Sequence, residues 1–387
     1  MPSSSASGTG SLGSRLGRIR GSKDHKKVNR KTQPVNEKFL PGWKKLSSFV
    51  YYRQDISESP FGSVKIIKEG APFLTGSHDF NIEQLLFYDL ETTGLSGGAG
   101  TLAFLAGFGW TEQNRLIVNQ YFLSDFPGEV DFLLRIKELL AENKILVSYN
   151  GKSFDHPLLK TRFLLKGMQM PVLSEIDLLH ISRRLWKNRL PSCRLGVIEN
   201  NILDIHRVGD IPGIDIPDVY FNFLKNSQTD KLQDVFKHHL QDIKSLAFLF
   251  SHIERLWNKP EHCQDEDKTS LGKLLLLKKR TEGLTLLRTS WEDGDYDAGK
   301  FLSLYLKRAG SIVEAVAVWE EMWKKRQDIF QGIELAKYYE HKVKDISRAL
   351  KIVTTLMEKD IYLLSKKGFD KLDYRKKRLK RKLLKGS

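Results

Sequence analysis

The first residues that could do chemistry are two acids separated by a single position. The apolar run over residues 84–90 contains Asp89 near its end, and Glu91 follows it. If this run is a buried strand, as we expect, residues two apart project from the same face. Two carboxylates held on one face repel each other strongly unless a cation sits between them. The pair therefore indicates a metal site, although an Asp-x-Glu triplet on a solvated strand edge would look the same.

Two further segments carry acids next to other functional side chains. Asp155 lies two residues before Pro157, which is favoured in the first turn of a helix. A helix N-cap would explain Asp155 alone but not Asn150 and Phe154 beside it. Asp242 follows His238 by four residues, so on a helix the two share a face. Taken alone, that pair could equally be a surface ion pair.

The elements that must position these side chains are strands followed by alternating helices and strands. Apolar runs predict strands over residues 84–90, 101–110, 115–122 and 145–149. The first three are closely spaced, which predicts an antiparallel meander. Helical spacing of apolar residues predicts helices over residues 129–142, 157–165 and 232–253. This order is typical of a mixed α/β sheet with helices on its faces. We expect residues 188–230, rich in Pro, Gly and Asn, to form an extended insertion near the site.

Beyond residue 260 the pattern predicts helices only. Phe301–Tyr305 aligns with Leu335–Tyr339, and the same offset takes Glu314–Val318 to Arg348–Ile352. That offset matches the helix-turn-helix period of about 34 residues that is the tetratricopeptide signature. Two copies are legible where about three are normally needed. Three alternatives remain open: a degenerate first copy near residues 270–295, packing of the repeats on the preceding domain, and coincidental spacing of ordinary helical hairpins.

Lysine and arginine concentrate at the two ends of the chain. The net charge is +16, and residues 1–50 and residues 366–387 each contribute +9, which leaves the middle near −2. Basic arms on a near-neutral body suit a polyanion such as nucleic acid, because each neutralised phosphate releases counterions. A pair of solvated tails is the plain alternative.

Composition excludes several classes of protein. The 387 residues exceed one typical domain, and 40% of them are hydrophobic, enough for a sizeable core. No stretch reaches the roughly 18 apolar residues of a membrane helix, and the first residues lack the apolar region of a signal peptide. Two cysteines are too few for a disulfide framework or a cysteine-based zinc site. We expect a cytoplasmic protein without membrane contact.

Taken in order, the three acidic segments resemble the motifs of the DEDD exonuclease superfamily. Those motifs are Asp-x-Glu, Asn-x-x-x-Phe-Asp and a final Asp preceded by Tyr or His, matched here by Asp89 to Glu91, Asn150 to Asp155 and His238 to Asp242. Within that superfamily the chain is similar to the bacterial YprB-like proteins, which join a ribonuclease-H-like domain to tetratricopeptide-like repeats. Further stretches that carry the resemblance are Gly94–Gly98, Asp177–His180, Arg189–Leu195 and Ile211–Gly213.

The resemblance implies a ribonuclease-H-like α/β domain with a mixed sheet flanked by helices, over residues 46–258. An all-α tetratricopeptide-like domain would follow over residues 268–362. Residues 1–45 would be a disordered basic tail and residues 363–387 a basic C-terminal tail. The implied activity is hydrolysis of phosphodiester bonds in DNA or RNA, from a single-stranded end in the 3′ to 5′ direction. A catalytically inactive nucleic-acid-binding adaptor, or a protein-interaction module acting through the repeats, is the alternative.

The implied chemistry assigns a role to each motif residue. Asp89, Glu91, Asp155 and Asp242 would hold two Mg²⁺ or Mn²⁺ ions, which suit carboxylate ligands. One histidine would position the attacking water. The His-type branch places the histidine five residues before the last Asp, where this chain has Lys237. The Tyr-type branch places its aromatic residue four before the last Asp, where this chain has His238, so His238 is preferred over His239. The predicted substrate-binding residues are Thr92, Gly94, Leu95, Tyr149, Asn150, Arg183 and Arg184. Trp186 is either a stacking partner for a base or a buried residue.

Overall fold

The computed structural model describes residues 40–62, 64–67, 79–94, 100–140, 144–264, 267–359 and 365–385. Leu95 and most of the predicted N-terminal tail lie outside these residues. The described chain begins before the predicted domain boundary at residue 46. Leu40 is buried and Lys44–Lys45 pairs with the next strand, so residues 40–45 are part of the folded domain.

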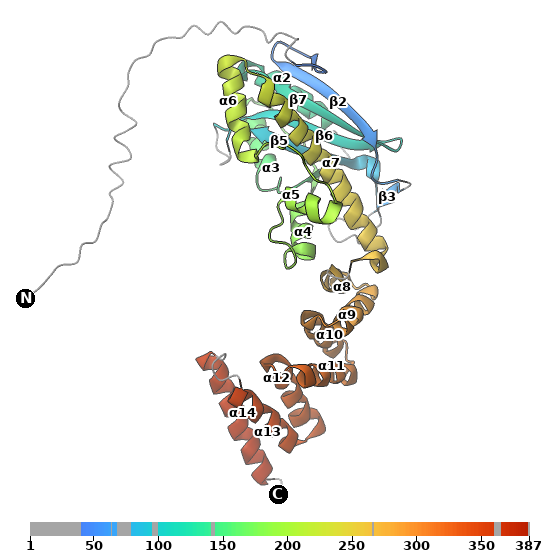
Figure 1. Cartoon of the computed structure of the whole chain (residues 1–387), viewed down its shortest axis with the longest axis vertical. Helices are drawn as coiled ribbons and strands as arrows, with labels where there is room; N and C mark the ends of the chain where they lie inside the picture. Colours follow the sequence, from blue (N-terminus) through green and yellow to red (C-terminus); the bar gives the residue numbers. More distant parts are fainter. Residues whose placement is uncertain are drawn as a thin grey trace, which may run out of the picture. The chain divides into compact units, whose positions relative to one another are not determined.

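A sheet of seven strands organises the first domain, in the order β1-β2-β7-β6-β5-β8-β9 (Figure 1). The strands are β1 (Lys44–Lys45), β2 (Val50–Glu58), β5 (Leu85–Thr92), β6 (Ala103–Glu112), β7 (Arg115–Leu123), β8 (Ile145–Ser148) and β9 (Ser174–Asp177). β5, β6 and β7 pair antiparallel, which confirms the meander, whereas β8 and β9 add in parallel next to β5. A separate small sheet pairs β3 (Ile66–Ile67) with β4 (Phe80–Asn81). The predicted mixed α/β sheet is therefore confirmed.

The helices of this domain are α2 (Glu129–Leu139), α3 (Asp155–Leu165), α4 (Leu178–Trp186), α5 (Leu195–Ile198), α6 (Ile216–Asn226) and α7 (Asp230–Asn258). The three predicted helices are present, with α3 starting two residues earlier and α7 longer at both ends. The expectation that residues 188–230 are extended is wrong. That segment contains α5, a π-helical turn over Glu199–Leu203, and α6, because its apolar residues, such as Tyr220 and Phe223, pack on the domain core.

Two glycines allow α7 to lie directly on the sheet. α7 contacts β5, β6 and β7 (Figure 1). A Cβ atom built on Gly107 of β6 would lie 2.0 Å from Ile243 and 2.5 Å from His239, both on α7. One built on Gly109 would lie 2.9 Å from Ile243. Because these glycines carry no side chain, the residues of α7 that face the sheet come within contact distance of its central strands.

Helices alone make up the described chain beyond residue 264. They are α8 (Lys268–Leu277), α9 (Glu282–Glu292), α10 (Tyr296–Arg308), α11 (Ile312–Lys325), α12 (Ile329–Tyr338), α13 (Ile346–Lys359) and α14 (Lys366–Lys385). Each packs on the one before it, and the starts of α11 at Ile312 and of α13 at Ile346 repeat the offset seen in the sequence. Tetratricopeptide identity itself stays a prediction.

The first helical pair joins two cores. Leu271 and Leu274 of α8 belong to the same buried cluster as Trp186, Phe250 and Trp257 of the first domain. Leu276 and Leu287 belong instead to the core of the C-terminal helices. The helices over residues 268–292 therefore pack on the first domain, whereas their status as a degenerate repeat copy stays a prediction. α8 and α9 complete the first domain as well as starting the second.

The C-terminal segment predicted as a basic tail contains a packed helix. Leu372 and Leu379 of α14 are buried in the core of the C-terminal helices. The fully buried Glu340 forms ion pairs with Arg375, Arg378 and Lys382, at 2.7, 2.6 and 3.0 Å.

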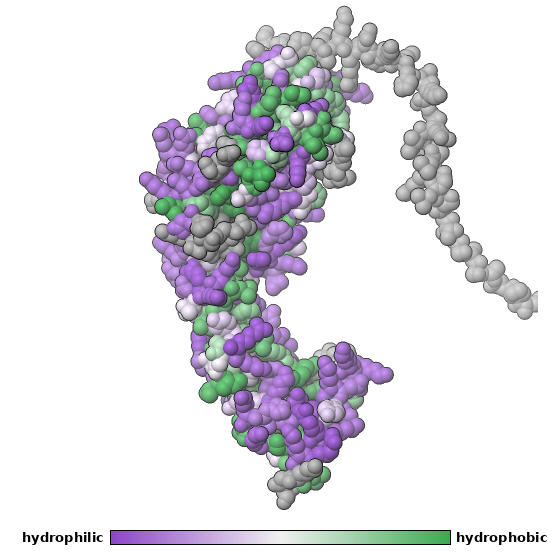
Figure 2. Space-filling view, turned by 180° about the vertical axis from the view of Figure 1, so that it is seen from behind, coloured by the Kyte–Doolittle hydropathy of each residue, from purple (hydrophilic) through white to green (hydrophobic). Residues whose placement is uncertain are grey.

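Hydrophilic residues cover most of the face seen in Figure 2. Within the described ranges, no helix combines the length and apolarity needed to cross a lipid bilayer.

Candidate active site

The four predicted acids come from three elements of the first domain. Asp89 and Glu91 stand on β5, Asp155 is the first residue of α3, and Asp242 lies in α7. Phe154 is the N-cap residue of α3 and Asp155 already lies inside the helix, so the N-cap alternative for this acid does not hold. The charges of Asp242 and Asp155 both act on Asp89 and on Glu91. Folding therefore brings together acids from the first strand of the meander and from the last helix of the domain.

Three of the four acids, Asp89, Glu91 and Asp155, have too little neighbouring positive charge to stabilise their ionised form. Burial, followed by the charges of Asp242 and Asp155, holds the pKa of Asp89 and that of Glu91 well above their usual range. Burial and the charge of Glu175 raise the pKa of Asp155 to about 7. A carboxyl whose pKa rises in this way is destabilised as an anion. The cluster therefore lacks the counter-charge that a bound cation would supply.

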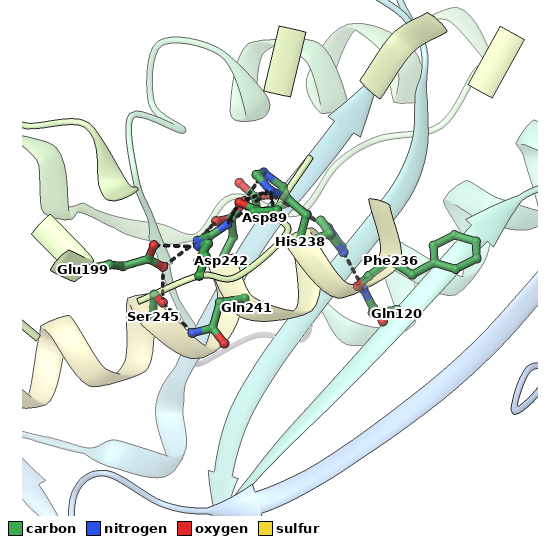
Figure 3. A network of polar contacts seen from close by, with 11 residues as sticks. Asp89, Gln120, Glu199, Phe236, His238, Gln241, Asp242 and Ser245 are labelled. Atoms are coloured by element: carbon green, nitrogen blue, oxygen red, sulfur yellow. Dashed lines mark hydrogen bonds and ion pairs between the residues drawn. The ribbon is translucent and has the colours of Figure 1, made fainter. Parts of the chain in front are cut away.

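The fourth acid has the opposite balance. Burial alone would raise the pKa of Asp242, but the hydrogen bonds and charges of His238 and Arg207 outweigh it and hold that pKa below its usual range. His238 Nε2 lies 3.2 Å from Asp242 Oδ2, and Arg207 Nη2 contacts Asp242 Oδ1. Asp242 is thus engaged through both oxygens, by His238 (Figure 3) and by the Arg207 guanidinium.

His238 is held between two carboxylates. Its Nδ1 lies 2.8 Å from Asp210 Oδ1, and its Nε2 faces Asp242. Burial opposes a charged ring, but the hydrogen bonds and charges of Asp242 and then Asp210 raise the pKa of His238 to about 9. Asp210 therefore orients the ring so that Nε2 points at the carboxylate cluster. Lys237, the position favoured by the His-type motif, is exposed and pairs with Asp234.

His239 has a different task from its neighbour. Its side chain is fully buried, and burial lowers the pKa of His239 to about 4. Arg53 donates to Gln120 Oε1 at 2.6 Å, so the Gln120 amide nitrogen faces His239 Nδ1 at 2.8 Å and donates to it. The proton of the neutral ring is then on Nε2, which donates to the main-chain oxygen of Asp89 at 3.0 Å. His239 thus holds the backbone of β5 rather than facing a water.

A second set of contacts lies around the residues that flank Asp155. Tyr88 donates to Glu175 Oε1 at 2.9 Å, and His156 Nδ1 lies 3.4 Å from Glu175 Oε2. A Cβ atom on Gly151 would lie 2.5 Å from Ser148, so only glycine fits where the chain turns after β8. These contacts define how the loop before α3 approaches the carboxylates of β5.

A metal ion fits this donor set. Glu91, His238 and Asp242 each offer a ligand atom, and these atoms lie within 4.8 Å of one another. The unbalanced charge of Asp89, Glu91 and Asp155 is the second observation that favours a cation. The carboxylate oxygens of this set are ligands that suit Mg²⁺ or Mn²⁺.

Comparisons with known proteins agree with this fold. Residues 86–254 match the family model described as RNase_H superfamily, so the first domain is ribonuclease-H-like. The chain is 36% identical over 330 residues to the uncharacterized protein YprB of Bacillus subtilis, covering 81% of this chain and 79% of that protein. The chain belongs to the YprB family.

Solved structures add a weaker likeness. The chain is similar to exonuclease I without ligand, with 16% identity and a TM-score of 0.32, covering 47% of this chain and 45% of that one. It is also similar to Escherichia coli exonuclease I in complex with a dT13 oligonucleotide, with 19% identity and a TM-score of 0.29, covering 40% and 42%. The YprB-family chain thus spans less than half of these exonuclease chains, and scores this low carry no argument about activity.

The residues predicted to bind substrate have different surroundings in the structure. Thr92 is the last residue of β5, and its hydroxyl donates to the carbonyl of Gly94, two residues beyond the strand, at 2.8 Å. The Tyr149 ring packs against the core and its hydroxyl donates to the Cys193 carbonyl at 2.7 Å. Asn150 has a positive φ of 69° and donates its backbone N–H to Asp177.

The basic segment after β9 divides into exposed and buried residues. Arg183 and Arg184 are exposed on α4, where contact with a phosphate backbone stays a prediction. Trp186 is fully buried and its Nε1 donates to Asp267 at 3.1 Å, so it cannot stack on a base. Arg189 also donates to Asp267, at 2.9 Å, and so belongs to the contact with α8.

Sequence reasoning missed several residues of the site. Arg207, Asp210 and Glu199 all lie in the 188–230 segment, which carries no periodic pattern that would single them out. Their mixture of charges is ordinary for a surface loop. The sequence placed this segment near the site, and the contacts of Arg207 with Asp242 and Glu199 identify which of its residues take part.

Proposed function

We propose that the protein is a metal-dependent nuclease that hydrolyses phosphodiester bonds of DNA or RNA, as an exonuclease acting 3′ to 5′. The observation that carries the proposal is the convergence of Asp89, Glu91 and Asp155 with their pKa values raised by burial and mutual repulsion. A purely structural cluster would bring in enough cations to neutralise itself. The ribonuclease-H superfamily match over residues 86–254 supports the same reaction class.

Asp89, Glu91, Asp155 and Asp242 would hold the divalent ions, Mg²⁺ or Mn²⁺, with His238 beside them. Bound at these carboxylates, such ions would polarise the phosphodiester and activate water. His238 Nε2, with the ring oriented by Asp210, would position the attacking water. His239 would keep the backbone of Asp89 in register through the hydrogen bond to its carbonyl oxygen.

The test is hydrolysis of single-stranded DNA and RNA, labelled at the 5′ end, with Mn²⁺ or Mg²⁺. We expect products shortened stepwise from the 3′ end and a loss of turnover on the order of 10³-fold or more in Asp89→Asn. Asp131→Asn, an exposed acid in the first turn of α2, is the matched control and should cleave normally.

Each contrary result has a distinct meaning. Unchanged turnover in Asp89→Asn would remove the site assignment. Binding without cleavage, in the presence of either metal, would instead support the inactive adaptor.

A further inference from the structure

The guanidinium of Arg207 lies beside the candidate metal ligands. Arg207 follows the π-helical turn and contacts three acids at once. Its Nε lies 2.7 Å from Glu199 Oε2, its Nη1 lies 3.1 Å from Asp210 Oδ2, and its Nη2 contacts Asp242 Oδ1. Only 14% of its side chain is exposed. Arg207 is therefore a built component of the site and not a passing surface arginine.

Arg207 occupies an atom that a metal ion would need. Glu91, His238 and Asp242 have their potential ligand atoms within 4.8 Å of one another. Asp242 Oδ1 contacts the Arg207 guanidinium and Asp242 Oδ2 faces His238, so each oxygen has a partner in the protein. A divalent ion bound at Asp242 would lie next to the guanidinium. Two positive charges at that separation repel each other, and the ion must compete with Arg207 for the carboxylate.

The contacts of Arg207 with Glu199 give the guanidinium a second anchor. Glu199 is fully buried, accepts from Nε and Nη2 of Arg207, and also accepts from the Ser245 hydroxyl. An arginine that released Asp242 would therefore keep a charge-assisted pair with Glu199. The arginine can give up one acid without becoming an unpaired buried charge.

The segment that carries Arg207 is lightly packed. Val208, next in the chain, is 96% exposed, and Gly209 has a φ of 67° with no atom near the position of a Cβ. Segments with few buried apolar contacts rearrange at low cost compared with core elements. Movement of Arg207 away from Asp242 therefore does not require disruption of the domain core.

We propose that Arg207 is a placeholder cation, which neutralises Asp242 in the metal-free protein and competes with the divalent ion for that carboxylate. The inference rests on the proposed function, since it presumes that the carboxylate cluster binds metal. A divalent ion that binds at Asp242 would then replace the Arg207 guanidinium there. Arg207 is a positioning residue in this scheme, and its effect is read in metal affinity.

The experiment is titration of Mn²⁺ into the metal-free, full-length protein by calorimetry. Arg207→Gln removes the competing charge and should bind Mn²⁺ at least threefold more tightly than the unaltered protein. Because this change leaves the buried Glu199 without its partner, the pair Glu199→Gln with Arg207→Gln is the second variant. Arg135→Gln is the charge-matched control, since Arg135 pairs with the exposed Glu138 on α2.

A further variant tests whether the effect passes through Asp242. In an Asp242→Asn background, Arg207→Gln should no longer tighten Mn²⁺ binding, because the contested carboxylate is gone. Tighter binding in the double Gln variant, lost in this background, supports the placeholder role. Equal or weaker Mn²⁺ binding in that variant, with Mn²⁺ bound by the unaltered protein, overturns it and leaves the nuclease proposal intact. No Mn²⁺ binding by the unaltered protein would overturn both.

Discussion

Two clusters of charge in this chain are built in opposite ways. At Glu340 one buried carboxylate meets Arg375, Arg378 and Lys382, and their hydrogen bonds outweigh burial and hold its pKa below the usual range. At the end of β5, burial and other carboxylates hold the pKa of Asp89 well above it. The first cluster is neutralised and joins a helix to its neighbours. In the second cluster, buried carboxylates repel one another.

The difference separates a structural site from a functional one. Ion pairs that serve folding are satisfied within the protein, because an unpaired buried charge costs stability. A cluster of like charges persists only where the rest of the fold offsets its cost, and such clusters concentrate at functional sites. The charge balance of each cluster, not its number of acids, therefore indicates its role.

Truncation of the chain between the two clusters tests whether their regions are separable. A chain ending at Lys259 loses Leu271, Leu274 and Leu275 from the core of the first domain. At about 1.5–3 kcal/mol for each buried leucine, we expect the first domain to lose roughly 5 kcal/mol or more of unfolding free energy. A chain ending at Asp293 keeps α8 and α9 and should retain most of that stability.

Chemical denaturation of both truncated chains, followed by far-UV circular dichroism, makes the measurement. Equal stability of the two would mean that α8 is dispensable to the first domain. The regions would then be independent, contrary to the shared core.

Glu340→Gln should weaken the neutralised cluster. The substitution removes the anion that three cations of α14 contact, although those cations can partly rehydrate. We expect a loss of about 2 kcal/mol in unfolding free energy, within the range for hydrogen bonds to charged groups. Glu321→Gln, an exposed acid paired with Lys325 on α11, is the matched control for denaturation. The same loss in both variants would remove the special role of Glu340.

Asp155→Asn should have the opposite sign, because the pKa of Asp155 is raised to about 7. An unfolded Asp titrates near 3.9, so between pH 4 and 7 the folded state binds more protons and stability falls as pH rises. Asn cannot ionise. We expect the variant to stabilise the metal-free protein by at least about 1 kcal/mol at pH 8, and by less at pH 5.

Thermal unfolding in chelator at the two pH values tests this sign, with Asp131→Asn as the control. Glu340 provides the contrast, since its lowered pKa contributes stability that is lost as the pH falls. A destabilised Asp155→Asn at pH 8 would show that the carboxylate cluster is not under repulsion.

The smallest effect concerns the outer face of α14. Lys380 and Arg381 are exposed there, away from the face that buries Leu379. If α14 also contacts nucleic acid, changing both to Gln should lower the salt dependence of single-stranded DNA binding by about 1.4 in log–log slope. Lys137 and Lys160, exposed on α2 and α3, changed to Gln together, provide the control. An unaltered slope would restrict α14 to its structural role.

The sequence by itself predicted β5, β6, β7 and β8, the main helices and the acidic segments around Asp89, Asp155 and Asp242. These depend on local periodicity and on motif order, which survive without knowledge of the fold. The resemblance to the YprB-like proteins was drawn from the same motifs, and the 36% identity to YprB confirms it.

Only the tertiary structure decided what surrounds those acids. His238 and His239 are adjacent in the sequence, yet one faces Asp242 and the other is buried against the Asp89 backbone. Arg207 reaches Asp242 across 35 residues of chain, and Trp186 reaches Asp267 across 81. Such contacts depend on how distant segments pack, and no local pattern encodes them. The charge balance that distinguishes the carboxylate cluster from Glu340 is a property of that packing.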